Sequence, residues 1–226
     1  HDHNETVFAP KIISLLENGQ KLALISDAGT PLISDPGYKL VCLAQQHQIQ
    51  VIPLPGASAL ITALSVSGLA TDKFCFEGFL STKKQSRCNQ LATYLNEIRT
   101  LIFYEAPHRL LATLKDMRDI FGADHTVVVS RELTKTFETI KKDTLEVLVN
   151  WVENDKDQQK GEIVLLVEGF KPVNKLNTES TLSSQTENIL SHLLEELSLT
   201  QAVKLTVAIT GEKKKVVYQR ALEKRQ

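Results

Sequence analysis

The sequence predicts an α/β fold, and two observations carry this prediction. Short apolar runs alternate with helical patterns along most of the chain, an order typical of βαβ units with a parallel sheet and right-handed crossovers. The 226 residues, of which 42% are hydrophobic and 23% charged, are enough to bury the cores of two globular domains.

We expect the first domain to span residues 1–72. Its elements, in chain order, are a helix over residues 7–18, a buried strand over 21–25, a helix over 36–46, a strand over 50–53 and an apolar helix that residues 55–58 open and that ends near residue 67. Asp35 suits the N-cap of the second helix, with Pro36 at its first position. Residues 68–72 are the predicted boundary to a second domain.

The second α/β domain is predicted over residues 73–170. Its expected elements are strands over residues 74–78, 101–104, 126–130 and 162–167, which alternate with helices over about 85–97, 107–121 and 144–154. The repetition of this order supports two α/β units in one chain.

The chain changes character after the second domain. Residues 171–184 have the composition of a linker, and residues 185–226 are predicted to form a small helical domain. Its features are a capping box over 184–187, a helix cap at Thr200, a helix end at Gly211 and a basic third helix from Lys213. Such a helix-turn-helix-like bundle either contacts RNA or stabilises a dimer, and the sequence leaves both open.

Several classes of protein find no support in the sequence. No apolar run reaches membrane-spanning length and no signal-peptide pattern opens the chain, so we expect a cytoplasmic protein. Three widely spaced cysteines match neither a disulfide framework nor a zinc site, and the histidines of residues 1–3 are interpreted as an exposed terminus. The net charge is −1, but residues 201–226 hold seven Lys or Arg against two acidic residues, which permits contact with nucleic acid without requiring it.

The most informative segment is residues 25–37, Ile-Ser-Asp-Ala-Gly-Thr-Pro-Leu-Ile-Ser-Asp-Pro-Gly. It follows an apolar run and precedes a helical pattern, and loops at such junctions bind nucleotide-like ligands in open α/β sheets. Gly29 lets a ligand approach the backbone N–H groups. The loop has neither a GxGxxG nor a GK[ST] motif, which favours a small adenosine-type ligand. The alternative is a tight turn in which Asp27 and Asp35 are structural.

Polar residues also follow other predicted strands, at the edge where open α/β sheets bind ligands. Ser58 is placed either to cap a helix or to donate to a ligand. Glu105 and Arg109 form either a site pair or an ordinary i,i+4 ion pair, and Arg131 with Glu132 are open to the same two interpretations. No GxSxG or HExxH motif is present, so hydrolase and metalloprotease functions have no support.

Six motifs in order carry a resemblance: residues 25–37, 54–59, 76–80, 101–109, 131–135 and 160–162. Together they closely resemble the ribosomal RNA small subunit methyltransferase I family, within the tetrapyrrole methylase superfamily. The resemblance covers essentially the whole chain, including the helical tail. It implies two α/β domains of the tetrapyrrole methylase type, with the cofactor in the cleft between them, and a helical C-terminal appendage.

The resemblance implies that S-adenosylmethionine is the cofactor and that the product is a 2′-O-methylated cytidine in 16S rRNA of the small ribosomal subunit. Family members are cytoplasmic bacterial proteins that look like homodimers, and no metal, membrane or DNA partner is implied. Tetrapyrrole-specific members tend to carry Gly-Gly-Asp-Pro where this chain has residues 28–31, which favours the RNA branch. The alternatives are a tetrapyrrole-type methylase of the same fold and a non-catalytic RNA-binding protein.

Site residues carry over at the matching positions. The cofactor contacts are expected at Asp27, Ala28, Gly29, Thr30, Ile33, Ser58, Ala59, Tyr104 and Glu105. Glu105 and Glu132 are the candidate general bases. The residues expected to hold RNA phosphates are Lys83, Lys84, Arg87, Arg109, Arg131 and Lys135. Family members carry a further Pro-Ile-Gly-Asn-Leu loop before the position of His1, so part of the cofactor site is missing from this sequence. The simpler interpretation is that such a segment precedes this sequence; the alternative is a protein that lacks the segment and with it the activity.

Overall fold

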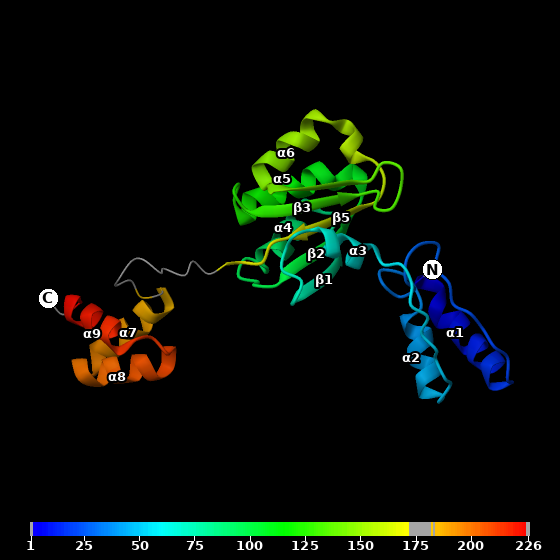
Figure 1. Ribbon diagram of the computed structural model, residues 1–226. Coiled ribbons are helices and arrows are strands. Elements are labelled where there is room, and N and C mark those ends of the chain that lie inside the picture. Colours follow the sequence, from blue (N-terminus) through cyan, green and yellow to red (C-terminus); the bar gives the residue numbers. More distant parts are fainter. Residues whose placement is uncertain (1, 172–181, 183, 225–226) are drawn as a thin grey trace. The chain divides into compact units, whose positions relative to one another are not determined.

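The computed structural model describes residues 2–171, 182 and 184–224, which divide into two compact units over residues 1–170 and 171–226 (Figure 1). Each unit has its own hydrophobic core. Most of the predicted linker at 171–184 lies outside the described residues.

The first unit is built on one five-stranded sheet with the order β1-β2-β5-β3-β4. Its strands are β1 (Phe74–Phe79), β2 (Thr100–Glu105), β3 (Thr126–Arg131), β4 (Thr139–Thr144) and β5 (Ile163–Val167). β1 and β2 are parallel, whereas β5 runs antiparallel to both β2 and β3, and β3 and β4 form an antiparallel hairpin. The expectation of a parallel sheet is therefore wrong for β4 and β5. For β4 the reason is the short loop after β3, because such a loop can join only antiparallel neighbours.

Helices cover both faces of this sheet (Figure 1). On one face, α4 (Lys84–Ala92), α5 (Leu110–Phe121) and α6 (Leu145–Asn154) pack over alternate strand residues such as Phe103 and Val129. On the other face, α3 (Ala59–Val66) packs over the intervening residues, including Ile102 and Val128. Two 3₁₀ turns, η1 (Pro107–Arg109) and η2 (Lys156–Gln159), complete the connections. Successive residues of each strand thus serve different helices.

The amino-terminal part of this unit contains α1 (Asp2–Glu17) and α2 (Tyr38–Gln46), which confirms the two predicted helices. The strands predicted over residues 21–25 and 50–53 are wrong, since neither segment forms a ladder with another strand of the described residues. Their apolar side chains are solvent-exposed, Ile25 to 85%. A strand exists only where a neighbour takes up its backbone hydrogen bonds, and apolar content alone does not supply one.

The start of α2 also differs from the prediction. Gly37, not Asp35, is the N-cap, and its φ of +130° is one that side chains rarely allow. Pro36 therefore lies outside the helix rather than at its first position. The prediction that Asp35 caps this helix is therefore wrong.

The second unit contains three helices in its described residues: α7 (Ser184–Glu196), α8 (Leu199–Thr210) and α9 (Lys214–Glu223). Their apolar faces meet around Leu190, Val203 and Val217. Ser198 rather than Thr200 is the N-cap of α8, and Gly211 ends this helix in the left-handed conformation, as predicted. Across the described parts of both units, no helix is long and apolar enough to span a membrane.

Candidate functional site

The carboxyl ends of three strands lie at one edge of the sheet. β1, β2 and β3 all point the same way, because β5 runs antiparallel to both of its neighbours. In the ladder, Glu105 of β2 and Arg131 of β3 both pair with Ile163, the first residue of β5. The structure therefore brings the polar segments after β1, β2 and β3 to a common edge, as open α/β sheets do at their ligand sites.

The loop over residues 26–37 has an unusual backbone. Gly29 adopts φ +73°, and two residues with side chains, Leu32 and Ser34, also have positive φ. The Ser26 hydroxyl donates to the carbonyl oxygens of Ala28 and Gly29 over 3.2 and 3.1 Å. Strained backbone of this kind is concentrated at ligand sites.

The same loop leaves its backbone accessible. A Cβ placed on Gly29 would meet only the Ala57 carbonyl oxygen, at 3.9 Å. Asp27, Ala28 and Ile33 are exposed beside it. An adenosine-type ligand can therefore approach this backbone without displacing side chains.

Thr30 joins this loop to the entry of α3. Its hydroxyl donates to the Ala57 carbonyl oxygen over 2.9 Å, across 27 residues of chain. Ser58 is the N-cap of α3 without a side-chain cap bond, so its hydroxyl is not consumed by the helix end, contrary to the capping interpretation. Ala59 follows as the first, exposed residue of the helix. The two predicted cofactor segments thus lie against each other.

Tyr104 lies beside the same two segments. Burial raises the pKa of its phenol, a backbone N–H of Leu60 in α3 lowers it, and the negative charge of Asp35 raises it. Its ring packs edge-on against Phe76 and Phe79, with centroids 4.8 and 5.7 Å away. Phe76 and Phe79 hold the phenol between α3 and the loop. The motif over residues 76–80 is the only signal in the sequence that pointed to these two rings.

Glu105 lies on the opposite face of β2. Its side chain is fully buried and accepts from the Thr113 hydroxyl of α5 over 2.6 Å and from the Ala106 N–H over 2.8 Å. The Nε of Arg109 lies 3.2 Å from this carboxylate without hydrogen-bond alignment, so their contact is electrostatic. Thr113 was not singled out from the sequence, since nothing marks an ordinary helical threonine. These contacts favour a structural role for Glu105.

The Glu132 side chain links two neighbouring segments by hydrogen bonds. Its carboxylate accepts from Lys135 Nζ and from the Glu162 N–H, each over 2.8 Å. Lys135 lowers the pKa of this carboxyl first, and the Glu162 backbone second. A Cβ on Gly161 would collide with the same carboxylate, so the Lys-Gly-Glu motif is explained by this contact. A lowered pKa makes Glu132 a weaker base, and its role as general base stays a prediction.

The residues predicted to hold RNA phosphates differ in availability. Arg87 is buried and forms an ion pair with Asp116 of α5 through Nη2 at 2.6 Å, and its role in RNA binding is not favoured. Arg109 donates to the Leu80 and Ser81 carbonyl oxygens over 2.7 and 3.0 Å. Both guanidinium groups tie the segment after β1 to the fold.

The other cations of this set are less enclosed. Lys83 is exposed and forms no ion pair within the described residues, and Lys84 is 77% exposed with Nζ 3.7 Å from Asp116. Lys135 bridges Glu132 and Glu162. Among the residues that the structure describes, no group of His, Cys, Asp or Glu is arranged to hold a metal ion.

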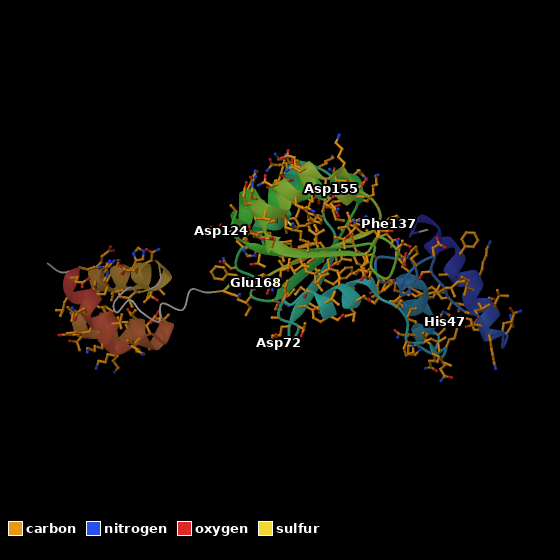
Figure 2. The ribbon with its side chains drawn as sticks, turned by 45° about the horizontal axis from the view of Figure 1, so that its top comes forward. His47, Asp72, Asp124, Phe137, Asp155 and Glu168 are labelled. Carbon is orange, nitrogen blue, oxygen red and sulfur yellow. The ribbon has the colours of Figure 1, made fainter. Side chains whose placement is uncertain are left out.

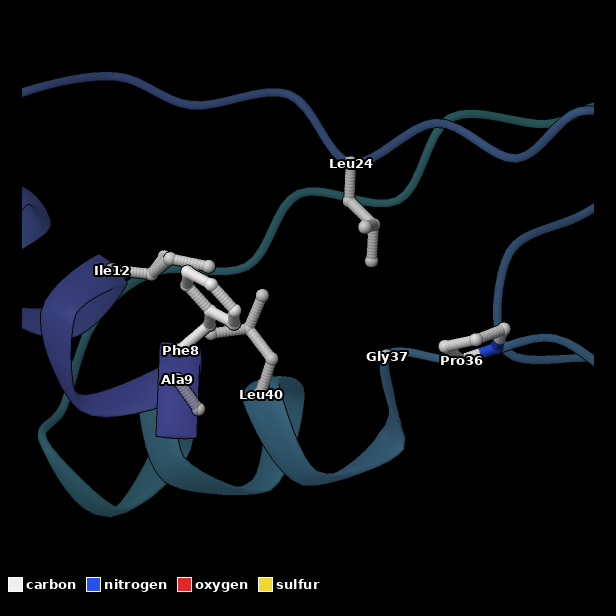
Figure 3. Close-up of a pocket in the computed structure, with 7 residues that line it drawn as sticks. All are labelled: Phe8, Ala9, Ile12, Leu24, Pro36, Gly37 and Leu40. Atoms are coloured by element: carbon white, nitrogen blue, oxygen red, sulfur yellow. The ribbon is translucent and has the colours of Figure 1, made fainter. Parts of the chain in front are cut away.

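An apolar cavity of about 150 Å³ lies between α1, α2 and the segment around Leu24 (Figure 3). Its lining residues are Phe8, Ala9, Ile12, Leu24, Pro36, Gly37 and Leu40. None of them is a predicted cofactor contact, and none has a charged side chain that could bind an amino-acid group. The cavity is therefore not the site that the loop and α3 form.

Two family models match the chain. One describes tetrapyrrole (corrin/porphyrin) methylases and matches residues 1–149. The other describes the RsmI C-terminal HTH domain and matches residues 180–225. The first model thus matches most of the first unit and the second most of the second unit.

Curated relatives are similar over nearly the whole chain. A ribosomal RNA small subunit methyltransferase I of Pseudomonas aeruginosa is 50% identical over 99% of this chain and 78% of its own length. The protein of the same name from Haemophilus influenzae is 48% identical over 97% of this chain and 76% of its own length.

Solved structures share the fold. Diphthine synthase matches with a TM-score of 0.56 at 14% identity, over 74% of this chain and 67% of its own. The methyltransferase CobJ matches with a TM-score of 0.53 at 16% identity, over 74% of this chain and 72% of its own. At these identities the likeness concerns the fold alone, and it agrees with the predicted tetrapyrrole methylase architecture.

Proposed function

Because this chain belongs to the ribosomal RNA small subunit methyltransferase I family, we propose that it transfers a methyl group from S-adenosylmethionine to the 2′-hydroxyl of a cytidine ribose in 16S rRNA. The observation that carries this proposal is the contact between Thr30 and Ala57, beside which Tyr104 is placed. This contact places the accessible backbone of the loop next to the first turn of α3, and the phenol of Tyr104 lies beside both.

These residues fit the cofactor. The accessible backbone around Gly29 suits the adenosine, and the N-terminus of α3 with the free Ser58 hydroxyl suits the carboxylate of the methionine part. When bound, S-adenosylmethionine supplies an electrophilic methyl group on a sulfonium. The residues of this chain then have to orient the ribose oxygen in line with that group, which alone can lower a barrier by about 7–11 kcal/mol.

The proton of the 2′-hydroxyl has to leave during the transfer. Glu105 is enclosed by Thr113 and Ala106, and Glu132 is held ionised by Lys135, so each has a structural set of partners. We propose orientation as the main contribution of the protein, with both carboxylates as candidate bases for a mutational test.

The RNA substrate is favoured over a tetrapyrrole. Relatives that match 97–99% of this chain are named as ribosomal RNA methyltransferases, whereas the solved methyltransferase CobJ and a solved uroporphyrin-III-C-methyltransferase are 16% and 17% identical. Exposed cations after β1, Lys83 and Lys84, are available for phosphates. A cytoplasmic homodimer is part of the same proposal.

The direct test incubates the purified protein with methyl-labelled S-adenosylmethionine and small-subunit RNA, either naked or assembled. We expect label in 16S rRNA at one cytidine, in a form that resists alkaline cleavage because the 2′-oxygen is blocked. Label on a base, or none in either RNA, would contradict the proposal. Binding of the cofactor without any transfer would instead support the non-catalytic alternative.

A further inference from the structure

An exposed aromatic ring lies on the loop that joins β3 to β4, next to the carboxyl edge of the sheet (Figure 2). Phe137 is 70% exposed, more than any other phenylalanine of this chain. A single exposed apolar side chain is ordinary on a protein surface. The loop that carries Phe137, however, is held unusually firmly.

The backbone of this loop is fixed by polar contacts along its length. Glu132 and Thr134 both adopt positive φ, at 51° and 65°. The Thr134 N–H donates to the Glu138 carboxylate over 2.7 Å, and the Lys135 N–H donates to the Glu132 carbonyl oxygen over 3.0 Å. Non-glycine residues in this region are strained, so other contacts must maintain them.

The loop is also tied to the proposed cofactor site. Leu133 packs against the cluster formed by α3 and its face of the sheet, and Tyr104 packs against the same cluster. The ring of Phe137 is therefore presented from a backbone anchored beside the elements that orient the methyl donor.

A buried cation without a direct ion pair lies under this loop. The Nε of Arg131 has no hydrogen-bond partner, its Nη1 donates to the Lys160 carbonyl oxygen over 3.5 Å, and it forms no ion pair within the described part of the chain. Its charge still acts at longer range on two carboxyls, Glu132 and Asp155, and lowers the pKa of each. Its Nη2 donates to the Thr139 hydroxyl over 3.2 Å, and that hydroxyl donates to the Phe137 carbonyl oxygen over 3.3 Å. An exposed ring and a buried guanidinium that forms no direct ion pair in the described residues are thus connected through one threonine.

From this arrangement we propose that Phe137 is the stacking platform for the base of the nucleotide to be methylated, with the charge of Arg131 favouring its phosphate. A nucleotide offers both partners, an aromatic face and an anion, in one ligand. RNA-binding proteins commonly hold unstacked bases on aromatic side chains. The inference rests on the proposed RNA substrate and assigns a positioning residue for it.

The test compares Phe137→Ala, Phe137→Leu, Phe137→Tyr and Phe137→Trp in methyl transfer to small-subunit RNA at saturating cofactor. Stacking is worth about 1–3 kcal/mol per base, so the Ala variant should lose roughly 5- to 150-fold in kcat/KM for RNA. The Leu variant should be equally poor, whereas Tyr and Trp should stay within about threefold of the parent because they keep a ring. The Kd for S-adenosylmethionine should not change.

The matched control is Phe170→Ala, because Phe170 is also exposed. It follows the C-terminal end of β5, which lies at the edge of the sheet opposite to the one beside Phe137. This variant should leave kcat/KM unchanged. Leu performing as well as Trp would overturn the proposal, and so would a change of oligomeric mass in the Ala variant, which would make Phe137 a protein contact. A parent protein that methylates no RNA would overturn the proposed function itself, and this inference with it.

Discussion

The hydroxyl of Thr30 donates to the carbonyl oxygen of Ala57 over 2.9 Å and thereby joins two loops that are 27 residues apart. Each loop alone is a turn before a helix, and the bond makes them one surface. Its removal is the most selective way to disturb the proposed cofactor site, since neither residue belongs to the hydrophobic core.

Thr30→Val should weaken the binding of S-adenosylmethionine with little loss of stability. One hydrogen bond contributes about 0.5–1.5 kcal/mol, so we expect a Kd about two- to twelvefold higher by isothermal titration. Thr93→Val is the control, because the Thr93 hydroxyl makes a similar bond to the Gln90 carbonyl oxygen in α4. Equal effects of the two substitutions on Kd would argue against a cofactor role for Thr30.

Gly29→Val should weaken cofactor binding more strongly. The substitution forces a branched side chain into φ +73° and covers the backbone that the ligand has to approach. Gly19→Val provides the comparison, because Gly19 has φ +83° and open space around it but lies after α1. Both variants should lose about 1–2 kcal/mol of stability from the left-handed backbone, and only the first should lose affinity.

Arg87→Ala should destabilise the first unit. Removing one partner of a buried ion pair leaves Asp116 with only the exposed Lys84 beside it, and the loss of such a partner typically costs about 3–5 kcal/mol and should lower the midpoint of urea unfolding. Lys84→Ala acts on the same carboxylate from the surface and should cost less than about 1 kcal/mol. An unfolding midpoint unchanged by Arg87→Ala would show that this pair is not formed.

Replacing Lys83 and Lys84 together by Ala should weaken RNA binding and flatten its dependence on salt. Two lost phosphate contacts should reduce the slope of log K against log salt by about 1.4 for single-stranded RNA. A matched loss of charge elsewhere, at Lys73 and Lys115, is expected to leave the slope unchanged. If both pairs behave alike, the phosphate contacts lie elsewhere, with the exposed Lys213 at the N-cap of α9 as the next candidate.

The stability of the second unit should depend on pH through Glu187. Burial raises the pKa of this carboxyl, but Lys224 and Arg220 outweigh it, so the pKa lies below its ordinary value. A depressed folded-state pKa stabilises the protein above the unfolded value, about 4.3, and the gain is lost as the pH falls further.

We therefore expect Glu187→Gln to lower the melting temperature of this unit at pH 7, and the deficit to shrink steadily as the pH falls below about 4.3. Glu212→Gln is the control, because Glu212 forms no ion pair in the described part of this unit. A deficit of the Glu187 variant that does not shrink with falling pH would assign it to packing instead.

Features that depend on neighbouring residues, such as helix ends, could be predicted from the sequence. The pairing of strands that are distant in the chain could not. Gly211 ends α8 as expected, because a helix end depends on the residues next to it. Strand β4 was missed because Ile140 is its only large apolar residue, and its lysines are typical of an edge strand. The apolar residues 21–25 looked like a buried strand for the converse reason, since nothing local shows whether a neighbour is present.

In the candidate site, too, local features could be predicted from the sequence and contacts between distant residues could not. The loop around Gly29 was identified from its own residues, whereas its contact with Ala57 required the structure. Arg87 looked like part of an exposed basic loop, since its partner Asp116 lies 29 residues further along the chain. Nothing in the motif over residues 131–135 indicated that Arg131 would be a buried guanidinium without a direct ion pair among the described residues.

The most direct measurement is a map of 2′-O-methylation on small-subunit RNA from a strain that lacks this gene, compared with its parent. The account predicts that one cytidine of 16S rRNA loses its ribose methyl group. It also predicts that the mark returns with the intact gene and not with a gene carrying Gly29→Val. An unchanged map in the deletion strain would contradict the account.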